Sequence, residues 1–218
     1  MRKTAGPQRD PGESPEYAAA GVDLNTAEAA RQRIGVLVAS TRTSLSAGRA
    51  GAFGGMVRIP HGMRKPTLVL STDGVGTKVL VAMQAERFDT VGEDLVNHGV
   101  NDILAHGATP IAFMDYIAGA GLEVEQIAGI VEGVARGCQA HEMALVGGET
   151  AQMPGLYQPG TYDLAGTIVG VVEEDQAIHG EAIVPGDVLL GYASTGLHTN
   201  GYTLARRIIF ERMKLKMA

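Results

Sequence analysis

The sequence is short of several residue types, and each shortage excludes a class of protein. Among 218 residues there is one cysteine, Cys138, and no tryptophan. A lone cysteine cannot form an internal disulfide, which fits a reducing cytoplasm. No apolar run approaches the roughly 20 residues that a membrane-spanning helix needs, and the polar stretch 1–16 lacks the apolar core of a signal peptide. We expect a cytoplasmic protein with a disordered lead over residues 1–16 and no membrane partner.

Basic residues are also scarce. The net charge is −6, and aromatic and basic residues do not interleave, which argues against a nucleic-acid partner. Between Thr4 and Met213 only Lys65 and Lys78 could bring an ammonium group to a phosphate site. A P-loop, a G-x-S-x-G elbow and a cysteine–histidine metal set are all missing from the sequence.

Glycine, in contrast, is abundant. The 30 glycines are about twice the usual share of roughly 7%. They follow no period of three, so they mark tight turns and close backbone approaches rather than a collagen-like repeat. With 45% apolar and 19% charged residues, the chain is globular.

Hydrophobic periodicity predicts alternating helices and strands, which leaves an α/β and an α+β fold both open. The predicted helices cover residues 26–40, 90–105, 123–139 and 202–213. The predicted strands cover residues 67–72, 110–118, 144–146, 163–172 and 188–193. Cys138 falls at helical spacing among apolar residues, so we expect it to be buried and structural; a reactive thiol is the alternative.

A first polar cluster follows the strand predicted at residues 67–72. Gly74 and Gly76 let the backbone approach a ligand, while Thr77 and Lys78 offer a hydroxyl and an ammonium group to phosphate. The order and spacing are not those of a P-loop. Asp73 would repel a phosphate unless a divalent cation bridged the two. The cluster indicates a metal-nucleotide loop, with a plain Asp-Gly turn as the alternative.

A second cluster lies on the helix predicted at residues 90–105. Asp94, His98, Asn101 and Asp102 are spaced so that they share one helix face. The oxygen atoms of Asn101 and Asp102 suit Mg²⁺. The alternative is a solvated helix face, and His98 alone is better interpreted as a hydrogen-bonded packing residue than as a catalytic base.

A third cluster follows the short strand predicted at residues 144–146. Gly147 and Gly148 precede Glu149 and Thr150, which puts a carboxylate at a strand end beside bare backbone. A salt-bridged turn would explain the same residues equally well.

A fourth cluster, residues 194–202, precedes the last predicted helix. Small hydroxyl residues and glycine before a helix N-terminus predict an anion site. The alternative is that Thr199 or Asn200 simply caps the helix. Several carboxylates spread over three of these clusters could together hold Mg²⁺ against a polyphosphate.

In this combination and order the motifs closely resemble the phosphoribosylformylglycinamidine cyclo-ligase (AIR synthetase) family. The resemblance runs from Tyr17 to the end of the chain. Its matching stretches are residues 17–23, 54–55, 72–78, 94–96, 100–102, 147–151, 153–155, 165–166 and 196–202. Related kinases and synthetases of the same superfamily share the carboxylates, but residues 153–155 and the loop around His198 favour the cyclo-ligase.

The resemblance implies an ATP-dependent ring closure with Mg²⁺. ATP would phosphorylate the formyl amide oxygen of formylglycinamidine ribonucleotide (FGAM); the amidine nitrogen would then attack, and aminoimidazole ribonucleotide (AIR), ADP and phosphate would result. The implied metal ligands are Asp73, Asp102 and Glu149. The implied catalytic residues are Asp102, Lys78 and His198, and the implied substrate contacts are His198, Thr199 and Asn200. The implied ATP contacts are Asp73, Gly74, Gly76, Thr77, Lys78, Asp94, Asn101, Gly147, Gly148, Glu149 and Thr150.

The resemblance also implies the domain organisation. Residues 17–175 would form an α+β, PurM-like N-terminal ATP-binding domain that dimerises through its sheet, and the glycine-rich loop 47–55 would close over the ligands. Residues 176–218 would begin a second α+β domain that is incomplete here, so a non-catalytic dimerisation or nucleotide-binding fragment is the alternative function. Ala18 and Gln152 depart from the family, which more often has lysine and glutamate there.

Overall fold

The computed structural model describes residues 24–48 and 54–217. The predicted lead, the motif at residues 17–23 and the centre of the glycine-rich loop lie outside the described residues. On either side of that loop, β1 (Ser46–Ala47) and β2 (Met56–Val57) form a two-stranded antiparallel pair.

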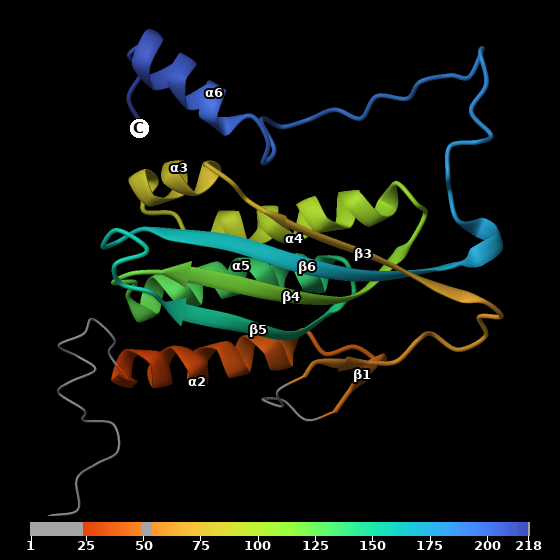
Figure 1. Ribbon diagram of the computed structural model, residues 1–218, viewed down its shortest axis with the longest axis horizontal. Helices are drawn as coiled ribbons and strands as arrows, with labels where there is room; N and C mark the ends of the chain where they lie inside the picture. Colours follow the sequence, from red (N-terminus) through yellow and green to blue (C-terminus); the bar gives the residue numbers. More distant parts are fainter. Residues whose placement is uncertain (1–23, 49–53, 218) are drawn as a thin grey trace, which may run out of the picture.

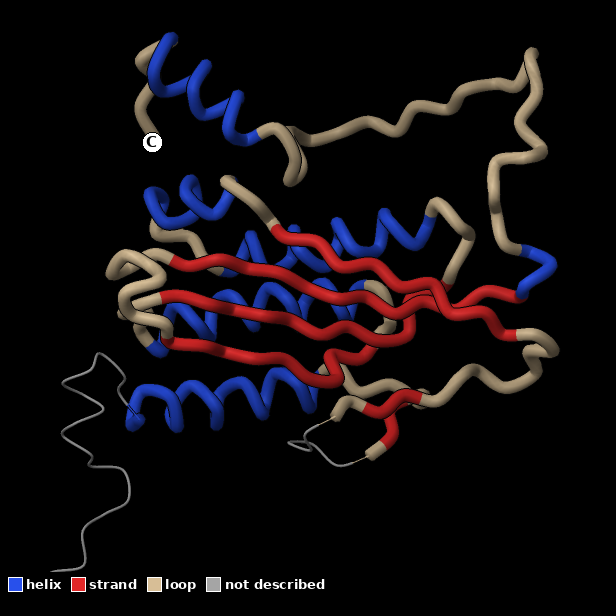
Figure 2. Tube along the Cα trace, in the orientation of Figure 1, coloured by secondary structure: helices blue, strands red, loops and turns tan. Residues whose placement is uncertain are grey.

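The main sheet has four strands in the order β3-β6-β4-β5 (Figures 1 and 2). They are β3 (Pro66–Gly74), β4 (Thr109–Gly119), β5 (Ala144–Gln152) and β6 (Tyr162–Glu173). β6 is antiparallel to β3 and to β4, whereas β4 and β5 are parallel. The parallel pair needs a crossover connection, which helix α5 supplies. A mixed sheet with its helices on one face confirms the predicted α+β fold.

Helices α4 (Asp89–Leu104) and α5 (Val124–Ala140) cover one face of this sheet (Figure 1). Helix α2 (Leu24–Ser40) packs against α5 and β5, and α3 (Lys78–Ala85) follows β3 directly. The core fills the space between sheet and helices. Its largest buried side chains include Ile103, Ile111, Phe113, Ile117, Ile127, Ile130, Met143, Leu164 and Ile168.

Two glycines let α4 and α5 approach until their backbones touch. A Cβ atom on Gly133 would lie 1.8 Å from the carbonyl oxygen of Asp89, and one on Gly92 would lie 2.1 Å from that of Ile130. Both distances are far below van der Waals contact, so no other residue fits without moving a helix. The position of α4 over the sheet therefore depends on glycine at these two positions.

Two strand predictions were wrong. β5 does not end at Val146 but continues through the two glycines to Gln152, because β4 extends beside it and supplies hydrogen-bond partners up to Gly119. The strand predicted at residues 188–193 is an exposed coil; Leu189 is 95% exposed. An apolar run becomes a strand only beside a partner strand, and none lies beside it among the described residues.

The chain after β6 lies apart from the sheet. It passes through a 3-10 helix, Glu174–Gln176, runs as extended coil, and ends in α6 (Tyr202–Arg206) and a π-helical turn, Arg207–Arg212. α6 lies beside α3 in Figure 1, and the two elements are in contact. The domain boundary at residue 176 stays a prediction.

Cys138 is fully buried on α5. Burial raises the pKa of its thiol, with a smaller contribution from the charge of Asp115. The structural interpretation of this cysteine is confirmed. Among the described residues, every helix is too short or too polar to cross a bilayer.

Replacing Gly133 by alanine tests the helix contact. We expect Gly133→Ala to lower the free energy of unfolding by about 1–3 kcal/mol, because the methyl group collides with backbone and forces α4 away. A Cβ atom added to the exposed helical Gly35 would meet nothing within 4 Å, so Gly35→Ala should be neutral or stabilising by up to about 1 kcal/mol. Urea unfolding followed by circular dichroism measures both; equal stabilities for the two variants would contradict a close contact at Gly133.

Candidate functional site

The polar residues of β3 and α4 meet where α4 crosses the C-terminal half of β3. Ser71 and Asp73 are two residues apart on β3, so both face the helix layer. The Ser71 hydroxyl donates to Asp102 Oδ2 over 2.6 Å, and Asp73 Oδ2 lies 2.7 Å from His98 Nε2. His98 and Asp102 are one helical turn apart on α4, which brings both over the strand.

The Asp73 carboxylate is well suited to remain charged. Its Oδ1 accepts the Gly74 N–H over 2.7 Å, and its side chain is 53% exposed. The backbone hydrogen bond from Gly74 lowers the pKa of Asp73, and His98 lowers it further through its hydrogen bond and charge. An ionised carboxylate at a strand end is available to a cation.

Asp73, His98 and Asp102 offer one ligand atom each, and these atoms lie within 4.8 Å of one another. Two carboxylates supply the hard oxygen ligands that Mg²⁺ prefers. The donor set therefore fits a divalent cation, with a histidine nitrogen beside it. Asn101, exposed on the same helix, adjoins this set.

Lys78 and Thr77 contact the C-terminal segment. The Lys78 ammonium group pairs with Asp94, donates to the His198 carbonyl oxygen over 3.0 Å, and lies 5.3 Å from the centre of the Tyr202 ring. The Thr77 and Thr203 hydroxyls are 2.9 Å apart. The predicted phosphate contacts thus lie beside the fourth cluster, and Lys78 begins α3, a helix that was not predicted from the sequence.

Within the fourth cluster, Thr199 is buried and its hydroxyl is hydrogen-bonded to His98 Nδ1. The His198 ring lies 3.2 Å from the Ser194 hydroxyl, and Asn200 is exposed. Neither Thr199 nor Asn200 caps α6, because the N-cap residue is Gly201 in a left-handed conformation. The capping alternative is therefore wrong.

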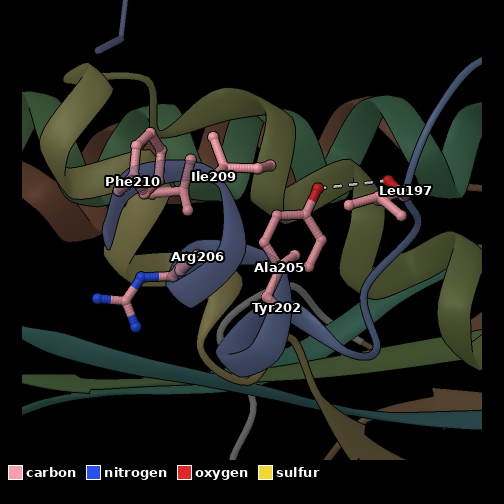
Figure 3. A pocket seen from close by; sticks show the side chains of 7 residues that line it. Leu197, Tyr202, Ala205, Arg206, Ile209 and Phe210 are labelled. Carbon is pink, nitrogen blue, oxygen red and sulfur yellow. Dashed lines mark hydrogen bonds between the residues drawn. The ribbon is translucent and has the colours of Figure 1, made fainter. Parts of the chain in front are cut away.

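Figure 3 shows a hollow next to this contact, between α3 and α6. Its volume is about 290 Å³. The lining is mostly apolar, and the Tyr202 hydroxyl donates to the Leu197 carbonyl oxygen across its rim over 3.4 Å. The lining residues are Val81, Leu197, Tyr202, Ala205, Arg206, Ile209 and Phe210.

Glu149 and Thr150 lie on β5, away from Asp73. The cross-strand register joins Glu149 to Tyr116, Tyr116 to Ala165, and Ala165 to Gly74. Strands are about 4.8 Å apart, so Glu149 is three strands, or roughly 14 Å, from Gly74. The structure brings Asp73 and Asp102 together but not Glu149, whose metal role stays a prediction.

Gly147 and Gly148 lie inside β5 rather than in a loop. A Cβ atom on Gly148 would lie 2.2 Å from Asp115 Oδ1, whereas one on Gly147 would meet nothing within 4 Å. Gly148 is thus needed to make room for a carboxyl group on the neighbouring strand β4.

Asp115 was not predicted from the sequence as a residue of interest. Its carboxyl group is desolvated, and this burial raises its pKa to about 7. The cross-strand row Asp73, Gly166, Asp115 and Gly148 places it two strands from the candidate cation ligands. An acidic residue in the middle of the apolar strand at residues 110–118 was the signal that could have identified it.

The chain matches a known protein family over its central part. The family model described as "AIR synthase related protein, N-terminal domain" matches residues 54–172. Curated phosphoribosylformylglycinamidine cyclo-ligases from Prochlorococcus marinus (strain MIT 9313) and Aromatoleum aromaticum (strain DSM 19018 / LMG 30748 / EbN1) are 49% identical over 194 residues and 50% identical over 199 residues. The alignments cover 89% and 91% of this chain, but only 56% and 57% of those proteins.

Solved structures with a similar fold are more distant. Thiamine-monophosphate kinase from Stenotrophomonas maltophilia K279a matches with a TM-score of 0.54 at 20% identity, covering 69% of this chain and 43% of that one. Hydrogenase maturation protein HypE in complex with ATP matches with a TM-score of 0.50 at 19% identity, covering 69% and 42%. At these identities the likeness concerns the fold alone, and it agrees with the predicted PurM-like domain.

The raised pKa of Asp115 predicts a specific pH dependence. The folded protein binds this proton more tightly than the unfolded chain, where an aspartate titrates near pH 3.9. Its stabilising contribution is complete below about pH 4 and is lost as the pH rises to about 7. Relative to Asp115→Asn, the wild type should lose up to about 4 kcal/mol of unfolding free energy between pH 4 and pH 8.

Urea unfolding at several pH values, followed by circular dichroism, measures this difference. Only the difference in pH slope between wild type and Asp115→Asn tests the prediction, because the asparagine amide changes packing, and with it stability, at every pH. Asp163→Asn, at an exposed position on the neighbouring strand β6, is the control substitution. Parallel stability curves for wild type and Asp115→Asn would show that the Asp115 carboxyl is not desolvated.

Proposed function

The chain belongs to the AIR synthase-related family, and on that premise we propose that it forms the N-terminal, Mg-ATP-binding part of a phosphoribosylformylglycinamidine cyclo-ligase. The identity of about 50% to relatives of that name is the observation that carries the proposal. The chain spans 56–57% of the length of these relatives, so the whole reaction is assigned to the full-length enzyme.

The proposed reaction closes the imidazole ring of AIR. ATP phosphorylates the formyl amide oxygen of FGAM and leaves as ADP. The amidine nitrogen then attacks the activated carbon and loses a proton, and the carbon–oxygen bond breaks as phosphate leaves. The protein positions the reactants and neutralises charge, which can supply a large share of such a rate enhancement. When bound, Mg²⁺ would neutralise the polyphosphate of ATP.

The chain's own residues suit this task. Asp73 and Asp102 would hold the cation, and Asn101 would support the metal or the nucleotide. Thr77 and Lys78 would reach the phosphates; to do so they would exchange their present partners Thr203 and His198 for phosphate oxygens. The Lys78 side chain is 17% exposed, and its ammonium group also pairs with Asp94.

The loop that bears His198, Thr199 and Asn200 would face FGAM. Support comes from its contacts with the proposed nucleotide residues, because a site that transfers phosphate between two substrates must hold them side by side. We also assign the strand β5 residues Gly147 to Thr150 to nucleotide binding, as the family resemblance implies. Because three strands separate Glu149 from Asp73, Glu149 would hold a Mg²⁺ ion other than the one at Asp73 and Asp102.

The second candidate function is a nucleotide-binding and dimerisation module without catalysis. Binding of Mg-ATP by this chain without any product, compared with product formation by a full-length counterpart, separates the two functions. Product formation by the 218-residue chain alone would exclude the second candidate.

One face of the main sheet is left open by the part of the chain that the structure describes (Figure 1), and this supports a homodimer. Leu68, Leu70 and Tyr116 are 46%, 62% and 39% exposed. Leu68 and Leu70 alternate with the residues of β3 that contact α4, and the strand register puts Tyr116 on the same face as these two leucines. Apolar side chains gathered on a sheet face favour a second copy as cover.

The single, buried Cys138 is consistent with a cytoplasmic location.

Neutralising one proposed metal ligand tests the nucleotide site. We expect Asp102→Asn to weaken Mg-ATP binding more than about 10-fold, because carboxylate–metal charge stabilisation is worth several kcal/mol. The exposed Glu132 on α5 provides a matched control, and Glu132→Gln should bind like the wild type. Isothermal titration calorimetry measures both affinities. Unchanged Mg-ATP binding by Asp102→Asn would show that the Asp102 carboxylate is not part of the nucleotide site.

The homodimer has its own test. We expect Leu70→Lys to convert dimers to monomers in sedimentation velocity runs, because it buries an ammonium group in the proposed interface. Leu156 is 74% exposed in a turn outside the sheet, and Leu156→Lys should leave the dimer intact. A wild-type monomer at all concentrations, or equal behaviour of both variants, would overturn the proposed interface.

A further inference from the structure

His98 lies between the candidate cation ligands and the loop before α6, and it contacts both. Its Nε2 atom lies 2.7 Å from Asp73 Oδ2, and its Nδ1 atom is hydrogen-bonded to the Thr199 hydroxyl. Asp73 belongs to the candidate cation ligands, and Thr199 to the loop before α6. The His98 side chain is only 9% exposed, so water does not readily replace either partner.

The two partners select one arrangement of protons. An ionised carboxylate only accepts, so His98 Nε2 must carry the hydrogen and donate it to Asp73. In a neutral ring Nδ1 then has a lone pair, which accepts the hydrogen of the Thr199 hydroxyl. Thr199 thereby stabilises the tautomer that serves Asp73.

As a result, each carboxylate oxygen of Asp73 accepts one hydrogen bond. Gly74 N–H donates to Oδ1 over 2.7 Å, and His98 donates to Oδ2. Each oxygen keeps a further lone pair free, so a cation can bind without breaking either bond. Hydrogen bonds of this kind orient carboxylates as metal ligands, and their loss commonly lowers metal affinity 10–100-fold.

We propose that His98 is a positioning residue that couples cation binding at Asp73 and Asp102 to docking of the loop 194–201. The inference rests on the proposed metal site and adds a link between that site and the substrate loop. Thr199 fixes the His98 ring, the ring fixes the Asp73 carboxylate, and a bound cation favours the same carboxylate orientation. By thermodynamic linkage, cation binding must then stabilise the docked loop by the factor by which docking strengthens cation binding.

Two substitutions at His98 separate its contacts. The amide nitrogen of glutamine can occupy the place of Nε2, so His98→Gln keeps a donor for Asp73 and loses the acceptor for Thr199. The shorter amide of asparagine can occupy the place of Nδ1, so His98→Asn keeps the contact to Thr199 and loses the donor for Asp73. His141 pairs with Asn97 on α4 over 2.8 Å, and His141→Gln is the matched control that disturbs α4 outside the site.

Two measurements on the 218-residue chain follow the two properties that His98 is proposed to couple, cation affinity and docking of the loop. Titration with Mn²⁺ followed by electron paramagnetic resonance gives cation affinity, and hydrogen exchange with mass spectrometry gives protection of residues 194–201 with and without Mn²⁺. In the wild type and in His141→Gln we expect Mn²⁺ to slow exchange in the loop. His98→Asn should bind Mn²⁺ about 10–100-fold more weakly. His98→Gln should bind it within a few-fold of the wild type, while the loop no longer responds to Mn²⁺.

The outcomes distinguish the inference from the function on which it rests. If the wild type binds no Mn²⁺, the proposed metal site fails. If the wild type binds Mn²⁺ but loop protection responds equally in all four proteins, the site stands and the coupling through His98 is refuted. Nitrogen coupling to bound Mn²⁺ that disappears in both His98 variants would make His98 a direct ligand and would also overturn its positioning role.

Discussion

The close contact between α4 and α5 is the constraint on which the rest of the structure depends. At Gly92 and Gly133 the two backbones touch, so α4 has one position over the sheet. One side of α4 buries Leu95 and Ile103 against the strands. The adjacent side of α4 places His98 and Asp102 against β3. Because the helix has one position, packing in the core and geometry at the site are decided together.

Three separate sets of polar contacts join the sheet, α4 and the C-terminal segment. Ser71 holds Asp102, His98 joins Asp73 to Thr199, and Lys78 reaches the His198 carbonyl. These bonds link β3, α4 and the segment before α6, which are far apart in sequence. A cation or a polyphosphate bound among them would act on all three elements, which gives the proposed enzyme a physical route between nucleotide and substrate.

Much of this could be predicted because the signals were local. The 3.6-residue pattern predicted a helix over residues 123–139, and α5 covers Val124–Ala140. The polar spacing on α4 correctly put His98 and Asp102 on one face. The contact of Asp115 with Gly148 and the continuation of β5 could not be predicted in this way, because each depends on the strand lying beside it. A short stretch of sequence does not specify which strand will lie beside it or in which register the two will pair.

The sequence by itself determined the residue types of the site and their order along the chain, and its resemblance to a known family indicated the fold class. Glycine beside carboxylate, hydroxyl and ammonium groups is a chemical property that local sequence carries. Tertiary structure alone decided which of these groups meet: Asp73 with His98 and Asp102, but Glu149 three strands away on β5. The reason is that hydrogen-bonded strand order and helix packing, rather than distance along the chain, set the distances between side chains.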